Sequence, residues 1–145
     1  MAAIMRKLNM ISRCEAIYRT EKSSLGIPGI YHSYILCICK NPGENQESLA
    51  KMLCINKSSV TRHLTYLENN GYINKKTSPG DRREQLVFPT DKMLLVYDEV
   101  LRISREWNLL VAEGITEEEL EIFHRISDKL VEKSQQIVYK GGGCK

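Results

Sequence analysis

The sequence predicts a mainly α-helical fold that carries one small β-hairpin. Apolar residues recur at helical spacing in six segments, whereas the period falls to two only between Tyr72 and Phe88. A Ser-Pro-Gly-Asp turn sequence, Ser78 to Asp81, lies in the middle of that stretch. The 145 residues, 42% of them hydrophobic, suit one continuous domain, 1–145, with a buried core.

Two helices are predicted at residues 2–24 and 30–40. The first places Ile4, Leu8, Ile11 and Tyr18 on one face, and the segment Leu25 to Gly29, with two glycines and a proline, breaks it. The second is apolar in its middle and stops at Asn41-Pro42-Gly43.

Residues 47–53 and the segment from Lys57 to Asn70-Gly71 predict two short helices joined by the turn 54–56. Asn56 is a good N-cap for the second helix, which turns its apolar residues inward. Two helices joined so tightly indicate a helix-turn-helix, whose second helix enters a DNA major groove. A polar outer face also fits a merely solvated helix, but this face has no glutamate before Glu68. The outward residues are Lys57, Ser58, Ser59, Thr61, Arg62 and Thr65.

Period two over 72–77 and 84–88 predicts two antiparallel strands, with Ile73, Leu86 and Phe88 facing inward. From Asn56 to Thr90 the chain has six basic and three acidic residues, a local excess of three positive charges. An arginine-tipped hairpin can enter a minor groove, although a solvated tip is the alternative. The basic residues of the hairpin are Arg82 and Arg83 at its tip and Lys75 and Lys76 on its rim.

The C-terminal part predicts a long helix capped by Thr90 and ending near Ala112, and a last helix opened by a Thr116 to Glu119 capping box. The long helix has two apolar stripes, which need two partners, and one of these can be a second chain. Residues 140–145 are expected to be a disordered tail.

Several stretches together resemble the MarR family of winged helix-turn-helix transcription regulators. They are the run Ser59–Leu64, the helix exit Leu67–Ile73, and Asp81-Arg82-Arg83 followed by Thr90. The resemblance implies a winged domain at 30–90 between dimerisation helices at 2–24 and 91–138. It also implies that Asp81 orients Arg83 in the minor groove. Pro89 departs from the leucine usual in the family.

The expected function is therefore sequence-specific binding of double-stranded DNA by a homodimer, as a repressor on a pseudo-palindromic operator. The alternative is a winged-helix protein-interaction module that does not bind DNA. The residues expected to contact DNA are Gln46, Lys57, Ser58, Ser59, Thr61, Arg62, His63, Thr65, Lys75, Asp81, Arg82 and Arg83.

The resemblance also implies release from DNA by an effector. Arg13, Tyr31 and His32 are expected near a cleft for a small aromatic ligand, unless Tyr31 and His32 merely begin a surface helix. Cys14, beside Arg13, is the candidate for a peroxide-sensitive thiol, with a structural thiol as the alternative. The cysteines expected to be small buried residues are Cys37, Cys39 and Cys54.

Other function classes lack their sequence features. The chain has no glycine-rich phosphate loop, nucleophile elbow or HExxH pattern, so no enzyme activity or cofactor is expected. His32, His63 and His124 fall in three different predicted helices, so no metal site is expected. No apolar run is long enough to span a membrane and no signal peptide is evident, which predicts a cytoplasmic protein.

Overall fold

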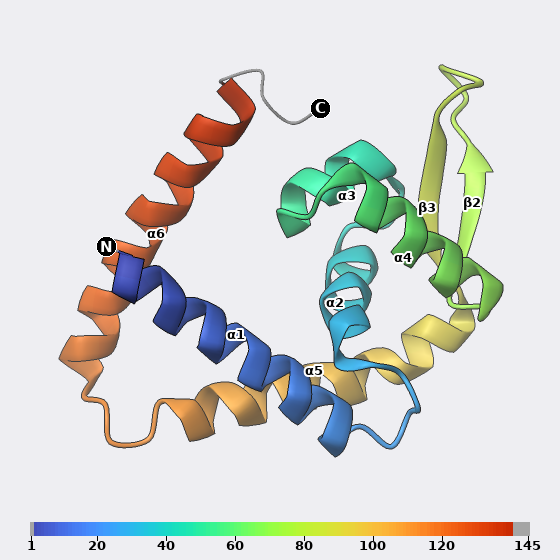
Figure 1. The fold of residues 1–145 in the computed structure, drawn as a ribbon. Helices are drawn as coiled ribbons and strands as arrows, with labels where there is room; N and C mark the ends of the chain where they lie inside the picture. Colours follow the sequence, from blue (N-terminus) through green and yellow to red (C-terminus); the bar gives the residue numbers. More distant parts are fainter. Residues whose placement is uncertain (1, 141–145) are drawn as a thin grey trace. The chain divides into compact units, whose positions relative to one another are not determined.

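The computed structural model describes residues 2–140, which form six α-helices, one short 3₁₀ helix and a three-stranded sheet (Figure 1). The predicted fold class is confirmed. The elements are α1 (Ala2–Lys22), η1 (Gly29–Tyr31), α2 (His32–Lys40), β1 (Glu44–Asn45), α3 (Gln46–Leu53), α4 (Lys57–Asn69), β2 (Ile73–Thr77), β3 (Gln85–Pro89), α5 (Asp91–Val111) and α6 (Glu117–Lys140).

The chain divides into two compact units within α5, residues up to 107 and residues from 108 onward. The first unit holds the helix-turn-helix and the sheet, and the second holds the end of α5 and all of α6. The prediction of one domain over 1–145 stays a prediction. The expected tail at 140–145 falls almost wholly outside the described residues.

The helix-turn-helix and its supports form the core of the first unit. The three apolar residues of α4, Val60, Leu64 and Leu67, are fully buried, as their helical spacing predicts. They pack in one cluster with residues of α2, α3, the sheet and the first half of α5. The core members outside α4 include Tyr34, Ile35, Ile38, Leu49, Ile73, Val87, Met93 and Val100.

The sheet has a strand that the sequence did not reveal, and one strand faces differently from the prediction. The short β1 pairs with β3, giving the order β1-β3-β2. The prediction that Leu86 and Phe88 face inward is wrong, because Val87 is the buried residue of β3. Val87 of β3 pairs with Lys75 of β2. Ile73 lies two residues before Lys75 on β2, so Val87 and Ile73 lie on the same face of the sheet. On the other face, the Lys76 ammonium lies 4.9 Å from the Phe88 ring centre.

Gly29 brings the start of α2 close to α1. A Cβ at Gly29 would lie 2.3 Å from the Ala16 carbonyl oxygen, so only glycine fits. The Gly29 amide donates a 2.7 Å hydrogen bond to Thr20 Oγ1. The predicted helix at 30–40 therefore begins later than expected: residues Gly29–Tyr31 form a 3₁₀ turn, and α2 begins at His32.

The predicted caps of the last two helices are confirmed. At the start of α5, Thr90 Oγ1 accepts a 3.4 Å hydrogen bond from the Met93 amide, and the Thr90 carbonyl accepts from the Leu94 amide at 3.0 Å. At the start of α6, the Thr116 amide donates to Glu119 Oε2 at 2.9 Å and the Glu119 amide donates to Thr116 Oγ1 at 3.2 Å. None of the helices in the described part of the chain is long and apolar enough to cross a membrane.

The cysteines differ partly from the prediction. Cys37 and Cys39 are half-buried, and burial raises the pKa of both thiols, that of Cys39 to about 11. The prediction that Cys54 is buried is wrong: it is exposed, in the left-handed region with φ 52°. Cys54 is the C-cap of α3, where the chain leaves the helix and turns toward α4, and its side chain lies outside the core.

Candidate nucleic-acid interface

The start of α4 is fixed by the side chain of Asn56. Asn56 Oδ1 accepts hydrogen bonds from the Ser59 amide at 2.8 Å and from Ser58 Oγ at 2.9 Å. The Ser59 amide, one of the first amides of the helix that lack a partner within the helix, thus has a hydrogen-bond acceptor. The Lys57 and Ser58 amides lie at the same N-terminal end, where the helix dipole is positive. This end suits contact with phosphate or base edges.

The outer face of α4 is polar, as predicted, and most of its hydroxyl groups are already engaged as donors. Thr61 Oγ1 donates to the Lys57 carbonyl and Thr65 Oγ1 donates to the Thr61 carbonyl, both at 2.9 Å. In this arrangement the hydroxyl oxygens are left mainly as acceptors. The exposed residues of this face are Lys57, Ser58, Thr61, Arg62 and Thr65, and Ser59 is half-buried.

His63, which could contact DNA or pack against the turn, does not belong to this exposed face. Only 9% of it is exposed, and its Nδ1 lies 2.8 Å from the hydroxyl of the buried Tyr34. Its ring also meets Tyr31 edge-on, and Tyr31 in turn stacks on Tyr66 with centroids 4.2 Å apart. Burial, and next the charge of Arg62, lower the pKa of His63. At i+3 from Val60, His63 shares the core face of α4 and ties it to α2.

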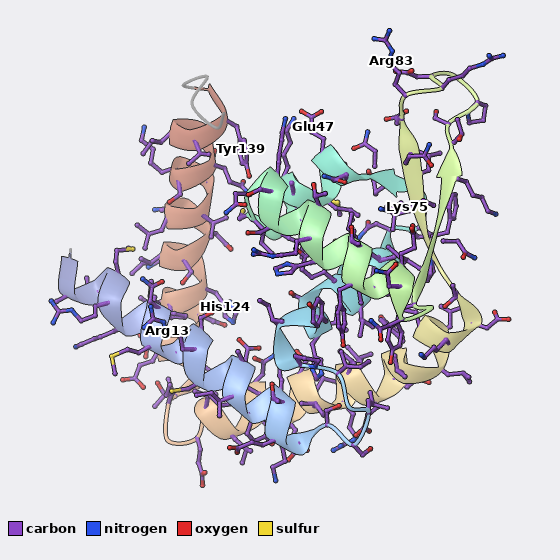
Figure 2. The ribbon with its side chains drawn as sticks, turned by 45° about the vertical axis from the view of Figure 1, so that its right-hand side comes forward. Arg13, Glu47, Lys75, Arg83, His124 and Tyr139 are labelled. Atoms are coloured by element: carbon purple, nitrogen blue, oxygen red, sulfur yellow. The ribbon has the colours of Figure 1, made fainter. Side chains whose placement is uncertain are left out.

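The residues at the start of α3 contact α4. Gln46 Nε2 donates to Thr61 Oγ1. Glu47 Oε1 lies 3.7 Å from Lys51 Nζ and 3.9 Å from Lys57 Nζ. Figure 2 shows Glu47 projecting from α3. Glu47 and Lys51 were absent from the predicted site, although their i,i+4 spacing was a visible signal of a pair.

The hairpin tip is held by a contact between Asp81 and the backbone of Arg83. Asp81 Oδ1 accepts a 2.9 Å hydrogen bond from the Arg83 amide, which fixes the backbone at the tip. Arg82 and Arg83 are exposed, and Figure 2 shows Arg83 pointing away from the tip. Lys75 is less open than predicted, since it is half-buried and lies 3.7 Å from Glu68.

The three residues predicted for an effector have different surroundings. Arg13 is exposed on α1. Tyr31 belongs to the aromatic group around His63. His32 is fully buried, and neither of its nitrogens has a hydrogen-bond partner in the described chain. Burial, and next the charge of Arg19, lower the pKa of His32 to about 4.

Polar and charged residues outside the predicted site lie around His32, where α1, α2 and α5 meet. Tyr18 on α1 donates a 2.6 Å hydrogen bond to Glu106 on α5, and Arg102 bridges Glu106 and Glu99. Arg19, whose Nε is also buried without a hydrogen-bond partner in the described chain, pairs with Glu15. The ion pairs within α1 and within α5 have i,i+3 or i,i+4 spacing. The hydrogen bond from Tyr18 to Glu106 joins helices far apart in sequence, so no local motif could reveal it.

Cys14 is exposed on α1, but Tyr18, the tyrosine one turn later, is bonded to Glu106. A shallow groove of about 380 Å³ lies between α1 and residues 28–30, and neither Arg13, Tyr31 nor His32 lines it. In residues 2–140 no three histidine, cysteine, aspartate or glutamate side chains are grouped to hold a metal.

Comparison with known proteins places these features in a family. The family model for the MarR family matches residues 32–85, which cover α2 to the start of β3. An uncharacterised HTH-type transcriptional regulator of Bacillus subtilis, YybA, is 30% identical over 143 residues, which is 95% of each chain.

Solved structures agree over almost the whole chain. A MarR protein from Peptoclostridium difficile is 26% identical with a TM-score of 0.88, over 94% of this chain and 90% of that one. A MarR family regulator from Listeria monocytogenes, complexed with a 26mer DNA, is 29% identical with a TM-score of 0.86, over 97% and 95%. With its helix-turn-helix and arginine-tipped hairpin, the chain belongs to the MarR family of DNA-binding transcription regulators.

Proposed function

We propose that the protein is a homodimeric repressor of a pseudo-palindromic operator, with α4 in the major groove and the hairpin tip in the minor groove. The observation that carries this proposal is the set of unpaired cations on the first unit. In the described chain Arg62, Arg82 and Arg83 are exposed and form no ion pair, so they are open to phosphates and base edges. The Listeria relative with its bound DNA supports the same use of this fold.

Exposed apolar side chains in each of the two units support the proposed homodimer. Exposed apolar residues on this scale mark protein contact surfaces, and a second copy of the chain is the partner that symmetry favours. They lie on α1, at Ile4, Met5, Met10, Ile11 and Ile17, and on α6, at Ile122, Phe123, Ile126, Val131 and Ile137.

The roles of the two arginines can be separated by experiment. Arg62→Ala should change which operator bases are preferred, since a contact to guanine is worth about 1–3 kcal/mol of discrimination. Arg83→Ala should instead weaken every sequence and lower the slope of log K against log salt by about 1. Fluorescence anisotropy on operator and random duplexes at several salt concentrations tests this division. Equal effects of both variants on both duplexes would mean that the roles are misassigned.

We also propose that a small aromatic acid releases the protein from DNA by acting at the junction of α1, α2 and α5. The support is the buried His32 ring and the buried Arg19 Nε, which have no hydrogen-bond partner within residues 2–140. Such groups suit a carboxylate or phenol oxygen. Salicylate-like acids should release a labelled operator from the wild type, and His32→Phe should raise the concentration required. No release at millimolar acid would refute this part.

Oxidation of Cys14 is a second proposed route of release, supported by its exposure and by Arg13 beside it. Peroxide should then weaken operator binding of the wild type but not of Cys14→Ser. If both proteins respond equally, or neither does, Cys14 is not the switch. Because the proposed partner is chromosomal DNA, the proposed place of action is the cytoplasm.

A further inference from the structure

Gln46 occupies a special place in the helix-turn-helix. It is the first residue of α3, directly after the N-cap Asn45, and its side chain reaches across to the middle of α4 (Figure 1 shows the two helices). There its Nε2 donates to Thr61 Oγ1, on the polar face of α4 between Lys57 and Thr65.

The hydrogen bonds of Thr61 fix which way the Gln46 amide points. The single hydroxyl proton of Thr61 is donated to the Lys57 carbonyl at 2.9 Å, so Thr61 Oγ1 can act toward Gln46 only as an acceptor. Gln46 must therefore turn its NH₂ group toward Thr61 and its carbonyl oxygen away. The orientation follows from the chemistry of the hydroxyl.

The amide that remains open is matched to one base. One Nε2 hydrogen is used by Thr61, which leaves the second hydrogen and the neighbouring Oε1, neither of which has a partner in the described chain. A donor beside an acceptor in one plane complements adenine, whose major-groove edge presents the N7 acceptor beside the N6 donor. Guanine presents only acceptors at N7 and O6, so it cannot satisfy both groups of the amide.

We propose that Gln46 reads an adenine in each half-site of the operator, and that Thr61 is the positioning residue that holds the Gln46 amide in its reading orientation. This inference rests on the proposed function, because it assumes that α4 enters the major groove. The competing role for Gln46 is a phosphate contact, since the first helix of a helix-turn-helix crosses the DNA backbone. A phosphate contact carries no base preference, and this difference decides between the two roles.

The structure offers a matched pair of threonines for the test. Thr61 and Thr65 are both exposed, and both donate to the carbonyl four residues earlier, but only Thr61 accepts from Gln46. Replacement of either by valine removes the hydroxyl and keeps the methyl group. Thr61→Val should therefore reduce adenine preference through the loss of the Gln46 contact. Thr65→Val, which alters the same DNA-facing side, serves as the control for base preference only: it should keep the preference for adenine at this position whatever it does to the affinity for all sequences.

The experiment selects duplexes from a randomised library with the wild type, Gln46→Ala, Thr61→Val and Thr65→Val. Anisotropy titrations of the enriched operator and its single-base variants then follow. The wild type should favour adenine at one position of each half-site by roughly 5- to 150-fold. Gln46→Ala should abolish this preference, and Thr61→Val should lower it in the wild type but not in the Gln46→Ala background.

Two results would overturn the inference while DNA binding persists. One is a Gln46→Ala variant that loses the same factor on every sequence and keeps its base preferences, as expected for a phosphate contact. The other is an equal effect of Thr61→Val and Thr65→Val on adenine preference. If the wild type enriched no sequence at all, the proposed operator function would fail instead.

Discussion

The buried imidazole of His32 should make the protein lose stability at mildly acidic pH. His32 is fully buried, and among the described residues neither of its nitrogens has a hydrogen-bond partner, so the folded state holds it neutral, with its pKa lowered to about 4. In the unfolded chain the pKa returns to about 6.5. As pH falls below 6.5, the unfolded state therefore binds a proton that the folded state does not, and stability decreases until the pH reaches about 4.

The size of the effect follows from these two pKa values. Between pH 7 and pH 5 the single proton should remove about 2 kcal/mol from the free energy of unfolding, and the full loss should be about 3 kcal/mol. The charged groups that act on His32 are the Arg19 guanidinium, which opposes protonation, and the Glu99 carboxylate, which favours it. A hydrogen bond from Arg102 lowers the pKa of Glu99, which favours its ionised form.

The assay is urea denaturation at pH 7 and pH 5, at one fixed protein concentration because a dimer's stability depends on concentration. His32→Phe and His32→Gln both remove the titrating group, one with an apolar and one with a polar side chain. Both should lose about 2 kcal/mol less than the wild type between the two pH values. A wild-type loss equal to that of both variants would refute the assignment of this pH dependence to His32.

Three further outcomes follow from single contacts. Tyr34→Phe leaves His63 Nδ1 buried without its partner and should cost about 1–3 kcal/mol in urea unfolding; an unchanged midpoint would contradict this. Asn56→Ala removes the N-cap of α4 and should cost about 1 kcal/mol by the same measurement; a cost near zero would show that the cap is dispensable. Glu47→Gln frees Lys51 and Lys57, so the salt slope on random DNA should steepen by about 1–2; an unchanged slope would mean that these lysines do not reach phosphates.

Local patterns predicted the elements and the recognition helix well. The 3.6-residue spacing of Val60, Leu64 and Leu67 and the N-cap Asn56 are properties of adjacent residues, and the structure confirms them. The face of β3 was mispredicted because three consecutive apolar residues, 86–88, fit either parity. The register of β3 is seen only in its pairing with β2 and with β1, and β1 is a two-residue strand too short to have a pattern.

The parts of the site that escaped prediction depend on tertiary contacts. His63 is polar, and its burial follows from the hydroxyl of Tyr34, 29 residues earlier in the chain. The Gln46 contact with Thr61 and the bridge from Tyr18 to Glu106 likewise join distant segments. The type of a polar side chain does not show which hydrogen-bond partner it has in the folded protein. For these residues the partner depends on how the backbone brings distant segments together.

The measurement that tests the central claim most directly is the stoichiometry and symmetry of the DNA complex. Light scattering coupled to size exclusion, on the protein alone and with a selected duplex, should give two chains in both cases. The selected sequence should contain inverted half-sites about one helical turn, ~34 Å, apart. A monomer at micromolar concentration that still binds DNA, or a selected site without two-fold symmetry, would contradict the account.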